Sequence, residues 1–185
     1  TEPDSGGAGL HRGGNGIRMT YRFLADGKIA IHDDRWFVPP WGVNGGHPGA
    51  RAKKLLERAD GSTTVVGNKV EDVEIKEGDL LLFITWGGGG WGDPLDRDPE
   101  LVCLEIRQGL VTPGGARDYG VVADEDGVID TNETEALRAE MKASRGELPL
   151  FDYGPPIETL RETCMHETGL PAPKQPQWGP KSAAA

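Results

Sequence analysis

Cysteine and aromatic side chains are scarce in this sequence of 185 residues. The two cysteines, Cys103 and Cys164, are too few for a disulfide framework, so reduced thiols and a cytoplasmic location are expected. Aliphatic and aromatic residues together make up only 36% of the chain. So low a fraction argues against a bundle of amphipathic helices.

Positive charge is also in short supply, because 20 basic residues face 30 acidic ones and leave a net charge of −10. Nucleic acid and anionic membranes are therefore not expected as partners, since neutralising phosphates requires a stripe of Lys and Arg. No apolar run approaches the roughly 20 residues of a membrane-spanning helix. The sequence opens at Thr1 without a basic and apolar leader, a start that Met removal or proteolytic cutting would each produce.

Glycine and proline, in contrast, are abundant, with 28 and 14 residues. Short strands joined by turns are expected from this composition. Residues 17–25 alternate between apolar and polar, and Asp26-Gly27 predicts a hairpin turn into a return strand at 28–32. Asp60-Gly61 predicts a second hairpin, and a turn at Gly78-Asp79 precedes a run that is apolar on both faces.

Helix signals begin only in the second half of the chain. Asp98 followed by Pro99 indicates a helix start, with an expected apolar stripe of Leu101, Leu104 and Ile106. Asn132 and Glu135 form a capping box that predicts a helix near 133–145, and a last helix is expected at about 157–168.

The predicted fold is therefore α+β and mostly β. An antiparallel, sandwich- or barrel-like sheet domain over 1–125 is followed by peripheral helices over 126–170. An extended Pro-rich tail over 171–185 completes the chain.

The stretch GGGGWGDP at 87–94 contains the pattern G-x-G-x-x-G after a strand, which raises the question of a nucleotide-binding loop. Such a loop should open a helix directly inside a parallel βαβ unit, but an Asp-Pro pair intervenes and the preceding strand belongs to an antiparallel series. No Lys-Ser/Thr follows the glycines either, which excludes a Walker loop. The glycines are instead expected to let the chain pass close to another element, with two tryptophans packed beside it.

Side chains with catalytic or metal-binding chemistry do not form a recognisable constellation. His32, Asp33 and Asp34 are adjacent, so they point to opposite faces of a strand, and a solvated strand end is expected. Cys164 and His166 lack a partner pair for zinc, and no Ser-His-Asp or Cys-His arrangement can be drawn from four histidines. No catalytic residue and no metal ligand is assigned to this chain.

The polar residues near the start of the chain lie among glycines, where close approach to a ligand or a neighbouring subunit is possible. For the Asp and Ser, bonding to turn backbone groups is the alternative. The candidates for interface contact or close packing are Asp4, Ser5, His11, Arg12, Trp86, Gly87, Gly88, Gly89, Gly90, Trp91 and Asp93.

Four motifs occur in a fixed order: PDSGGAGLHRGGNG, PPWGVNGGHPGA, GGGGWGDPLDRDPELV and ARDYGVV. Together they resemble the C-terminal part of the hydantoinase B family, which includes the acetone carboxylase α and acetophenone carboxylase subunits. The resemblance spans roughly residues 3–122. Members of the family normally continue far ahead of the first motif, so this chain looks like a split-off or cleaved piece of a hydantoinase B-type polypeptide.

The resemblance implies a hetero-oligomeric, ATP-dependent machine. A hydantoinase A-type subunit would bind ATP with Mg and phosphorylate a carbonyl or amide oxygen. A large hydantoinase B-type subunit would hold a divalent metal, Zn or Mn, in the part that this chain lacks. No cofactor is expected on the chain itself.

The function implied is that of a small subunit, inactive alone, in an ATP-dependent carboxylase of the acetophenone or acetone carboxylase kind. One alternative is a subunit of an ATP-dependent cyclic amide hydrolase of the N-methylhydantoinase or oxoprolinase type. Another is a non-enzymatic β-domain that serves as a binding module. A subunit should expose a large apolar or aromatic patch, whereas a free module should be a well-behaved monomer.

Overall fold

A computed structural model describes residues 1–67, 69–169 and 171–174. Most of the predicted tail, residues 175–185, lies outside the described part of the chain. Three sheets and several helices are present, and every strand pair is antiparallel. The predicted α+β class with antiparallel sheets is confirmed. Among the described residues, none of the helices is long and apolar enough to cross a membrane.

The dominant feature is a long two-stranded ribbon in which residues 10–31 run antiparallel to residues 70–92. Strand β1 (Arg18–Arg22) pairs with β7 (Leu80–Ile84), and β2 (Gly27–Ile31) pairs with β6 (Val70–Ile75). The ribbon continues beyond these strands, because the His11 and Trp91 backbones exchange hydrogen bonds of 2.9 Å in both directions.

The predicted hairpin between 17–25 and 28–32 is wrong. Gly27 begins β2, the ribbon bends just before it at Leu24-Ala25, and a turn at Lys76–Asp79 lies opposite. The Asp26 carboxylate accepts a 3.0 Å bond from the Glu77 amide and a 2.9 Å bond from the Lys76 ammonium. Because these bonds tie Asp26 to the turn on the opposite side of the ribbon, the chain continues along the ribbon where the sequence suggested a reversal.

Two further strands widen the middle of the ribbon, beside β7, into a four-stranded sheet of order β1-β7-β4-β5. Strands β4 (Lys53–Glu57) and β5 (Thr63–Val65) form a hairpin around Asp60-Gly61, as predicted. Gly61 has a φ of +83°, and the Asp60 carboxylate accepts a 2.9 Å bond from the Ser62 amide. These are the local interactions that make Asp-Gly a turn. One apolar core lies on the strands: Ile31, Leu56, Val66, Ile75 and Leu81.

The helices follow the ribbon in the chain. A 3-10 turn η1 (Pro94–Asp96) leads into α1 (Pro99–Arg107), α2 (Pro113–Ala116), η2 (Arg117–Tyr119) and α3 (Thr131–Ser144). The Asp98 side chain caps α1 as predicted, by accepting a 3.0 Å bond from the Glu100 amide. A second core gathers around these helices: Ala8, Val102, Cys103, Ile106, Val111, Ala116, Tyr119 and Val121.

Two helix details differ from the sequence-based expectation. The cap of α3 is Asp130, which accepts a 2.9 Å bond from the Glu133 amide, and not Asn132. In α1, Leu101 and Leu104 are 46% and 40% exposed, while Val102, Cys103 and Ile106 are buried. The predicted apolar stripe is therefore correct for Ile106 and wrong for Leu101 and Leu104.

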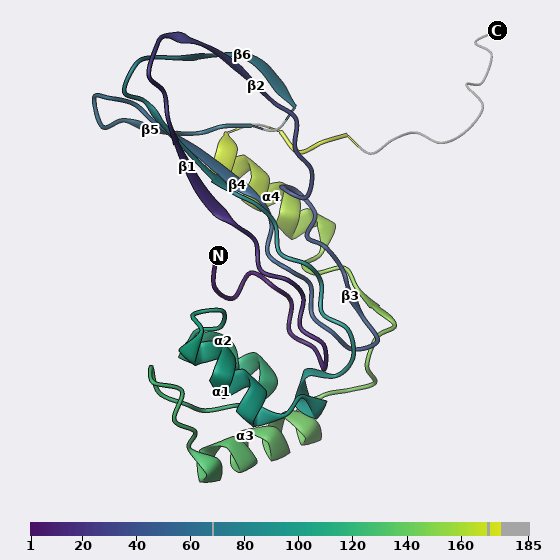
Figure 1. Cartoon of the computed structure of the whole chain (residues 1–185). Helices are drawn as coiled ribbons and strands as arrows, with labels where there is room; N and C mark the ends of the chain where they lie inside the picture. Colours follow the sequence, from purple (N-terminus) through teal and green to yellow (C-terminus); the bar gives the residue numbers. More distant parts are fainter. Residues whose placement is uncertain (68, 170, 175–185) are drawn as a thin grey trace, which may run out of the picture.

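The last elements return to the strands. A short pair joins β3 (Gly42–Val43) to β8 (Phe151–Asp152), and α4 (Ile157–Thr168) ends at Gly169 with a φ of +66°, as predicted. Figure 1 shows α4 beside β4, while α1, α2 and α3 gather at the opposite end. Between these two ends, several extended segments run side by side without forming a regular sheet.

Candidate functional site

These extended segments form what we call the glycine bundle: residues 4–9, 12–16, 41–50 and 86–92. Its members are joined by backbone hydrogen bonds that cross from one segment to the next. The Gly88 amide donates to the Gly14 carbonyl at 2.8 Å, and the Gly7 amide donates to the Gly88 carbonyl at 2.8 Å. The Gly90 amide donates to the His47 carbonyl at 2.9 Å. Residues far apart in the sequence are thereby held side by side (Figure 1).

Close contact explains the glycines at 87, 89 and 90. A Cβ atom on Gly87 would overlap the Ser5 carbonyl oxygen, one on Gly89 that of Trp41, and one on Gly90 that of Ala8. None of the three has a positive φ, so space is the constraint and backbone conformation is not. A Cβ on Gly88 would lie 3.1 Å from its nearest neighbour, the Gly14 nitrogen, which makes this glycine the least crowded of the four.

The same hydrogen bonds occupy the amide groups that a phosphate-binding loop would need. The Gly87 amide donates to Ala50 at 3.1 Å, and the amides of Gly88, Gly90 and Gly92 also donate to carbonyl groups. Phosphate cradles depend on such amides being free and on a helix start. Here the chain from 87 to 92 is extended, and α1 begins only at Pro99.

The first two polar candidates hold the start of the chain in place. The Asp4 carboxylate accepts bonds from the Thr112 amide at 2.8 Å and the Thr112 hydroxyl at 2.6 Å. The Ser5 hydroxyl donates to the Glu2 carbonyl at 2.5 Å and accepts from the Gly16 amide at 2.8 Å. Both side chains therefore serve as links between the bundle and its surroundings.

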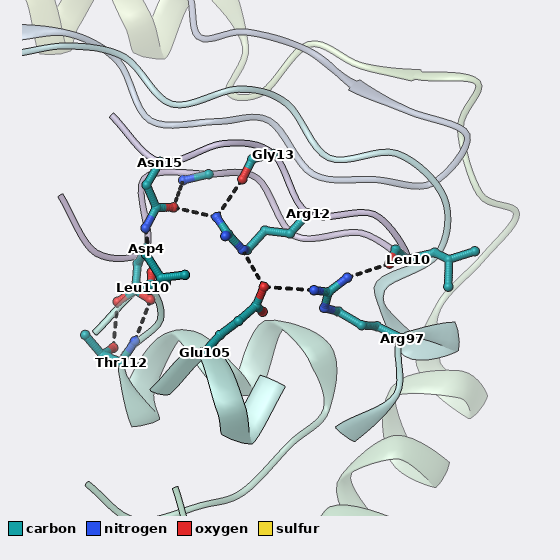
Figure 2. A network of polar contacts seen from close by, with 10 residues as sticks. Asp4, Leu10, Arg12, Gly13, Asn15, Arg97, Glu105, Leu110 and Thr112 are labelled. Atoms are coloured by element: carbon teal, nitrogen blue, oxygen red, sulfur yellow. Dashed lines mark hydrogen bonds and ion pairs between the residues drawn. The ribbon is translucent and has the colours of Figure 1, made fainter. Parts of the chain in front are cut away.

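Arg12 belongs to a buried ionic network that joins the bundle to α1 (Figure 2). Its Nε atom donates to Glu105 Oε1 at 3.0 Å, and Arg97 Nη2 donates to the same oxygen at 2.8 Å. Each guanidinium also reaches a backbone carbonyl, that of Gly13 for Arg12 and that of Leu10 for Arg97, both at 2.7 Å. One carboxylate on α1 thus holds two arginines and, through them, the backbone at Leu10 and Gly13.

Asn15 completes this network from inside the bundle. Its Nδ2 atom donates to the Leu110 carbonyl at 2.7 Å, while its Oδ1 atom accepts bonds from the Gly6 amide and from Arg12. Sequence reasoning missed both Asn15 and Glu105. A signal for Glu105 existed, because it shares a helical face with Val102 and Ile106, and a charge on a buried face requires a partner.

The remaining candidates lie at the rim of the bundle. Trp86 and Trp91 are 40% and 47% exposed, so they are not packed inside, and the Trp91 ring lies 5.5 Å from the ring of His11. Asp93 is buried, caps η1 by accepting a 2.9 Å bond from the Leu95 amide, and forms an ion pair with Arg145.

Ionisable groups elsewhere have structural partners. Asp33, expected to be solvated, is buried and forms an ion pair with Lys54. Burial lowers the pKa of the Lys54 ammonium to about 8, whereas its contact with the carboxylate favours the charged form. Burial raises the pKa of the Cys103 thiol, as is usual for an unreactive core cysteine.

Metal-binding side chains do not converge in the part of the chain that the structure describes. Across these residues, no group of three or more His, Cys, Asp or Glu side chains is placed to hold an ion. Arg12 is bonded to both Asn15 and Glu105, which suits a rigid connecting element.

Comparison with known proteins identifies the family. The hydantoinase B/oxoprolinase family matches residues 1–94, which contain the whole glycine bundle, and the chain belongs to this family. The resemblance inferred from the four motifs is thereby confirmed.

Two curated relatives share much of the chain. An uncharacterised protein of Methanocaldococcus jannaschii is 39% identical over 139 residues, covering 73% of this chain and 24% of its own length. The caprolactamase subunit beta of Pseudomonas jessenii is 34% identical over 143 residues, covering 74% of this chain and 24% of its own. This chain therefore spans about a quarter of the length of these relatives.

Solved structures share the fold. The ATP-dependent caprolactamase of Pseudomonas jessenii matches with a TM-score of 0.64 at 32% identity, over 74% of this chain and 24% of the other. An acetone carboxylase matches with a TM-score of 0.62 over 89% of this chain and 26% of the other. The identity in the second case is 22%, so that likeness concerns the fold alone.

Proposed function

We propose that this chain forms a non-catalytic structural part of an ATP-dependent enzyme that opens a cyclic amide. The observation that carries the proposal is the 34% identity to a caprolactamase subunit over 143 residues. The solved ATP-dependent caprolactamase supports it through the shared fold.

In such an enzyme, activation of the substrate belongs to other polypeptides. A hydantoinase A-type partner would bind ATP with Mg and phosphorylate the amide oxygen, because an unreactive lactam becomes open to attack once its oxygen is a phosphate ester. A larger hydantoinase B-type polypeptide would hold the divalent metal, Zn or Mn, needed for hydrolysis. This chain would contribute shape and rigidity to that assembly.

The glycine bundle supports this division of roles. The amides of Gly87, Gly88 and Gly90, the Asp4 and Ser5 side chains, and Arg12 all bond to groups within the chain. These bonds fix the bundle, which continues into the strands, against the helices. Such a connector suits a part that must present fixed surfaces to neighbouring subunits.

A ketone carboxylase is the second candidate. The observation in its favour is the extent of the shared fold, since the acetone carboxylase match covers 89% of the chain against 74% for the caprolactamase. The identity to the acetone carboxylase structure is 22%, against 32% to the caprolactamase structure, and this difference favours the amide hydrolase as the first candidate.

Gentle purification of the protein from its own host, followed by native mass and subunit identification, tests the proposal. Co-purification with an ATP-binding chain and a larger hydantoinase B-type polypeptide is expected. ATP hydrolysis by this complex should be stimulated by a lactam. Stimulation only by a ketone with bicarbonate would select the carboxylase instead. A clean monomer near 19.9 kDa would contradict both and leave a binding module.

A further inference from the structure

A row of exposed side chains crosses four neighbouring segments at the rim of the glycine bundle. His11 bridges to Trp91, Trp91 bridges to Val43, and Val43 pairs with Phe151 of β8. Side chains of directly opposed residues point to the same face of a sheet. The row therefore forms one continuous face.

Two more aromatic rings extend this face. Trp41 precedes Val43 by two residues and Tyr153 follows Phe151 by two, and the period of an extended chain keeps them on the same side. The ring centroids of Trp41 and Tyr153 lie 5.4 Å apart, and those of Phe151 and Tyr153 lie 6.0 Å apart. We call this set the aromatic stripe: His11, Trp41, Val43, Trp91, Phe151 and Tyr153.

The aromatic rings of the stripe are open to solvent, and Val43 between them is half-buried. Trp41, Trp91, Phe151 and Tyr153 are 44%, 47%, 42% and 56% exposed, and His11 is exposed as well. Single exposed aromatic residues are ordinary, but a contiguous row of them is typical of a binding surface. Tryptophan and tyrosine are also the residues most enriched among those that dominate interface energies.

The charge around the stripe narrows the choice of partner. The Arg35 guanidinium lies 5.5 Å from the centroid of the Trp41 ring, and no residue of the stripe is acidic. A second copy of this chain would place one arginine-bearing stripe against another, while each copy carries a net charge of −10. A partner with an apolar surface and a carboxylate opposite Arg35 fits better.

The length of the relatives indicates where such a partner comes from. Each of the two curated relatives is about four times as long as its match to this chain, since the match covers 24% of its length. His11, Trp41, Val43 and Trp91 all fall within the 94 residues that match the family. The stripe is thus built mainly on the family's own fold.

We propose that the aromatic stripe docks this chain onto the remaining part of a hydantoinase B-type polypeptide, an inference that rests on the proposed function. The partner surface is apolar and carries an acidic residue that pairs with Arg35. Burial of the rings supplies most of the affinity, and the ion pair sets the register of the two surfaces.

Photo-crosslinking in the gently purified native complex tests this surface. p-Benzoylphenylalanine is placed at Tyr153 and, as a matched control, at Tyr21, which is 48% exposed on β1 and outside the stripe. Crosslinks from position 153 are expected to reach hydantoinase B-type sequence outside the matched quarter. Tyr153→Ala combined with Trp41→Ala should weaken association by at least about tenfold, and Tyr21→Ala by less than about twofold.

The outcomes separate this inference from the proposed function. If the hydantoinase B-type polypeptide co-purifies but position 153 crosslinks only to a second copy, or to nothing, the stripe is not the docking surface and the proposed function stands. The assignment would also be overturned if Tyr21→Ala weakened association as much as Tyr153→Ala combined with Trp41→Ala does. If neither an ATP-binding chain nor a hydantoinase B-type polypeptide co-purifies, the proposed function itself fails.

Discussion

Replacing Gly89 with alanine tests the claim that the glycine bundle is closed by backbone contact. The new Cβ atom would overlap the carbonyl oxygen of Trp41, which belongs to a neighbouring backbone and cannot rotate away as a side chain could. Because the φ of Gly89 is not positive, alanine can adopt the native backbone conformation there. Any loss of stability therefore measures the steric overlap between the new Cβ atom and the Trp41 carbonyl oxygen.

The magnitude follows from the contacts around the site. Forcing an extra methyl group into a packed region costs about 1–3 kcal/mol. Displacing the Gly89 segment also weakens the Val43 to Gly90 bond of 3.0 Å and the Gly90 to His47 bond of 2.9 Å. Each such bond contributes about 1 kcal/mol. Alanine also restricts the unfolded chain more than glycine does, which offsets the destabilisation by about 0.4–1 kcal/mol. A net destabilisation of about 2–4 kcal/mol is expected.

Urea denaturation followed by tryptophan fluorescence measures this change, since Trp41, Trp86 and Trp91 border the bundle. Gly14→Ala is the matched control, because a Cβ at Gly14 meets nothing within 4 Å. Gly88→Ala, with its 3.1 Å neighbour, should fall between the two. If Gly89→Ala and Gly14→Ala differ by less than about 0.5 kcal/mol, contact does not explain the glycines.

Three other outcomes follow from the polar groups and the loop. Glu105→Gln should destabilise the chain by about 3–5 kcal/mol, because it leaves two largely buried arginines without a carboxylate. Glu140→Gln on the exposed face of α3 should cost almost nothing, and urea denaturation compares the two variants. The Asp79 carboxylate accepts a hydrogen bond from the Lys76 amide and pairs with Arg58, and these contacts lower its pKa below 3.8. The stability that they give the folded protein is present above pH 3.8 and is lost as the pH falls through the pKa of the folded state. The difference in free energy of unfolding between wild type and Asp79→Asn should therefore become smaller as the pH is lowered below about 4. Calorimetry should detect no ATP binding to the chain alone, because the amides of Gly87, Gly88, Gly90 and Gly92 already donate to carbonyl groups. Micromolar affinity would contradict this reasoning.

Local features were read correctly from the sequence where short-range chemistry decides them. Asp98 caps α1, Asp60-Gly61 turns a hairpin, and Gly169 ends α4 with a left-handed φ. In each case the determining contacts lie within a few residues of one another. The family could also be inferred, because several motifs in a fixed order carry more information than any single glycine run.

The errors arose where a local pattern has two structural solutions. Asp26-Gly27 is compatible with a hairpin that reverses the chain or with a ribbon that continues in the same direction. The choice depends on residues 76–79, about 50 positions away. The apolar residues of α1 admit two faces, and packing in the second core buries Val102 and Cys103 together with Ile106, while Leu101 and Leu104 stay exposed.

The sequence by itself determined that this protein is an acidic, glycine-rich α+β chain of the hydantoinase B/oxoprolinase family with closely packed backbone segments. Composition, caps, turns and motif order suffice for this, since each is a property of neighbouring residues. Tertiary structure alone decided which carbonyl oxygen meets each glycine, that Glu105 holds both Arg12 and Arg97, and that six residues from four segments share one exposed face. Those facts depend on long-range register, which no short stretch of sequence encodes.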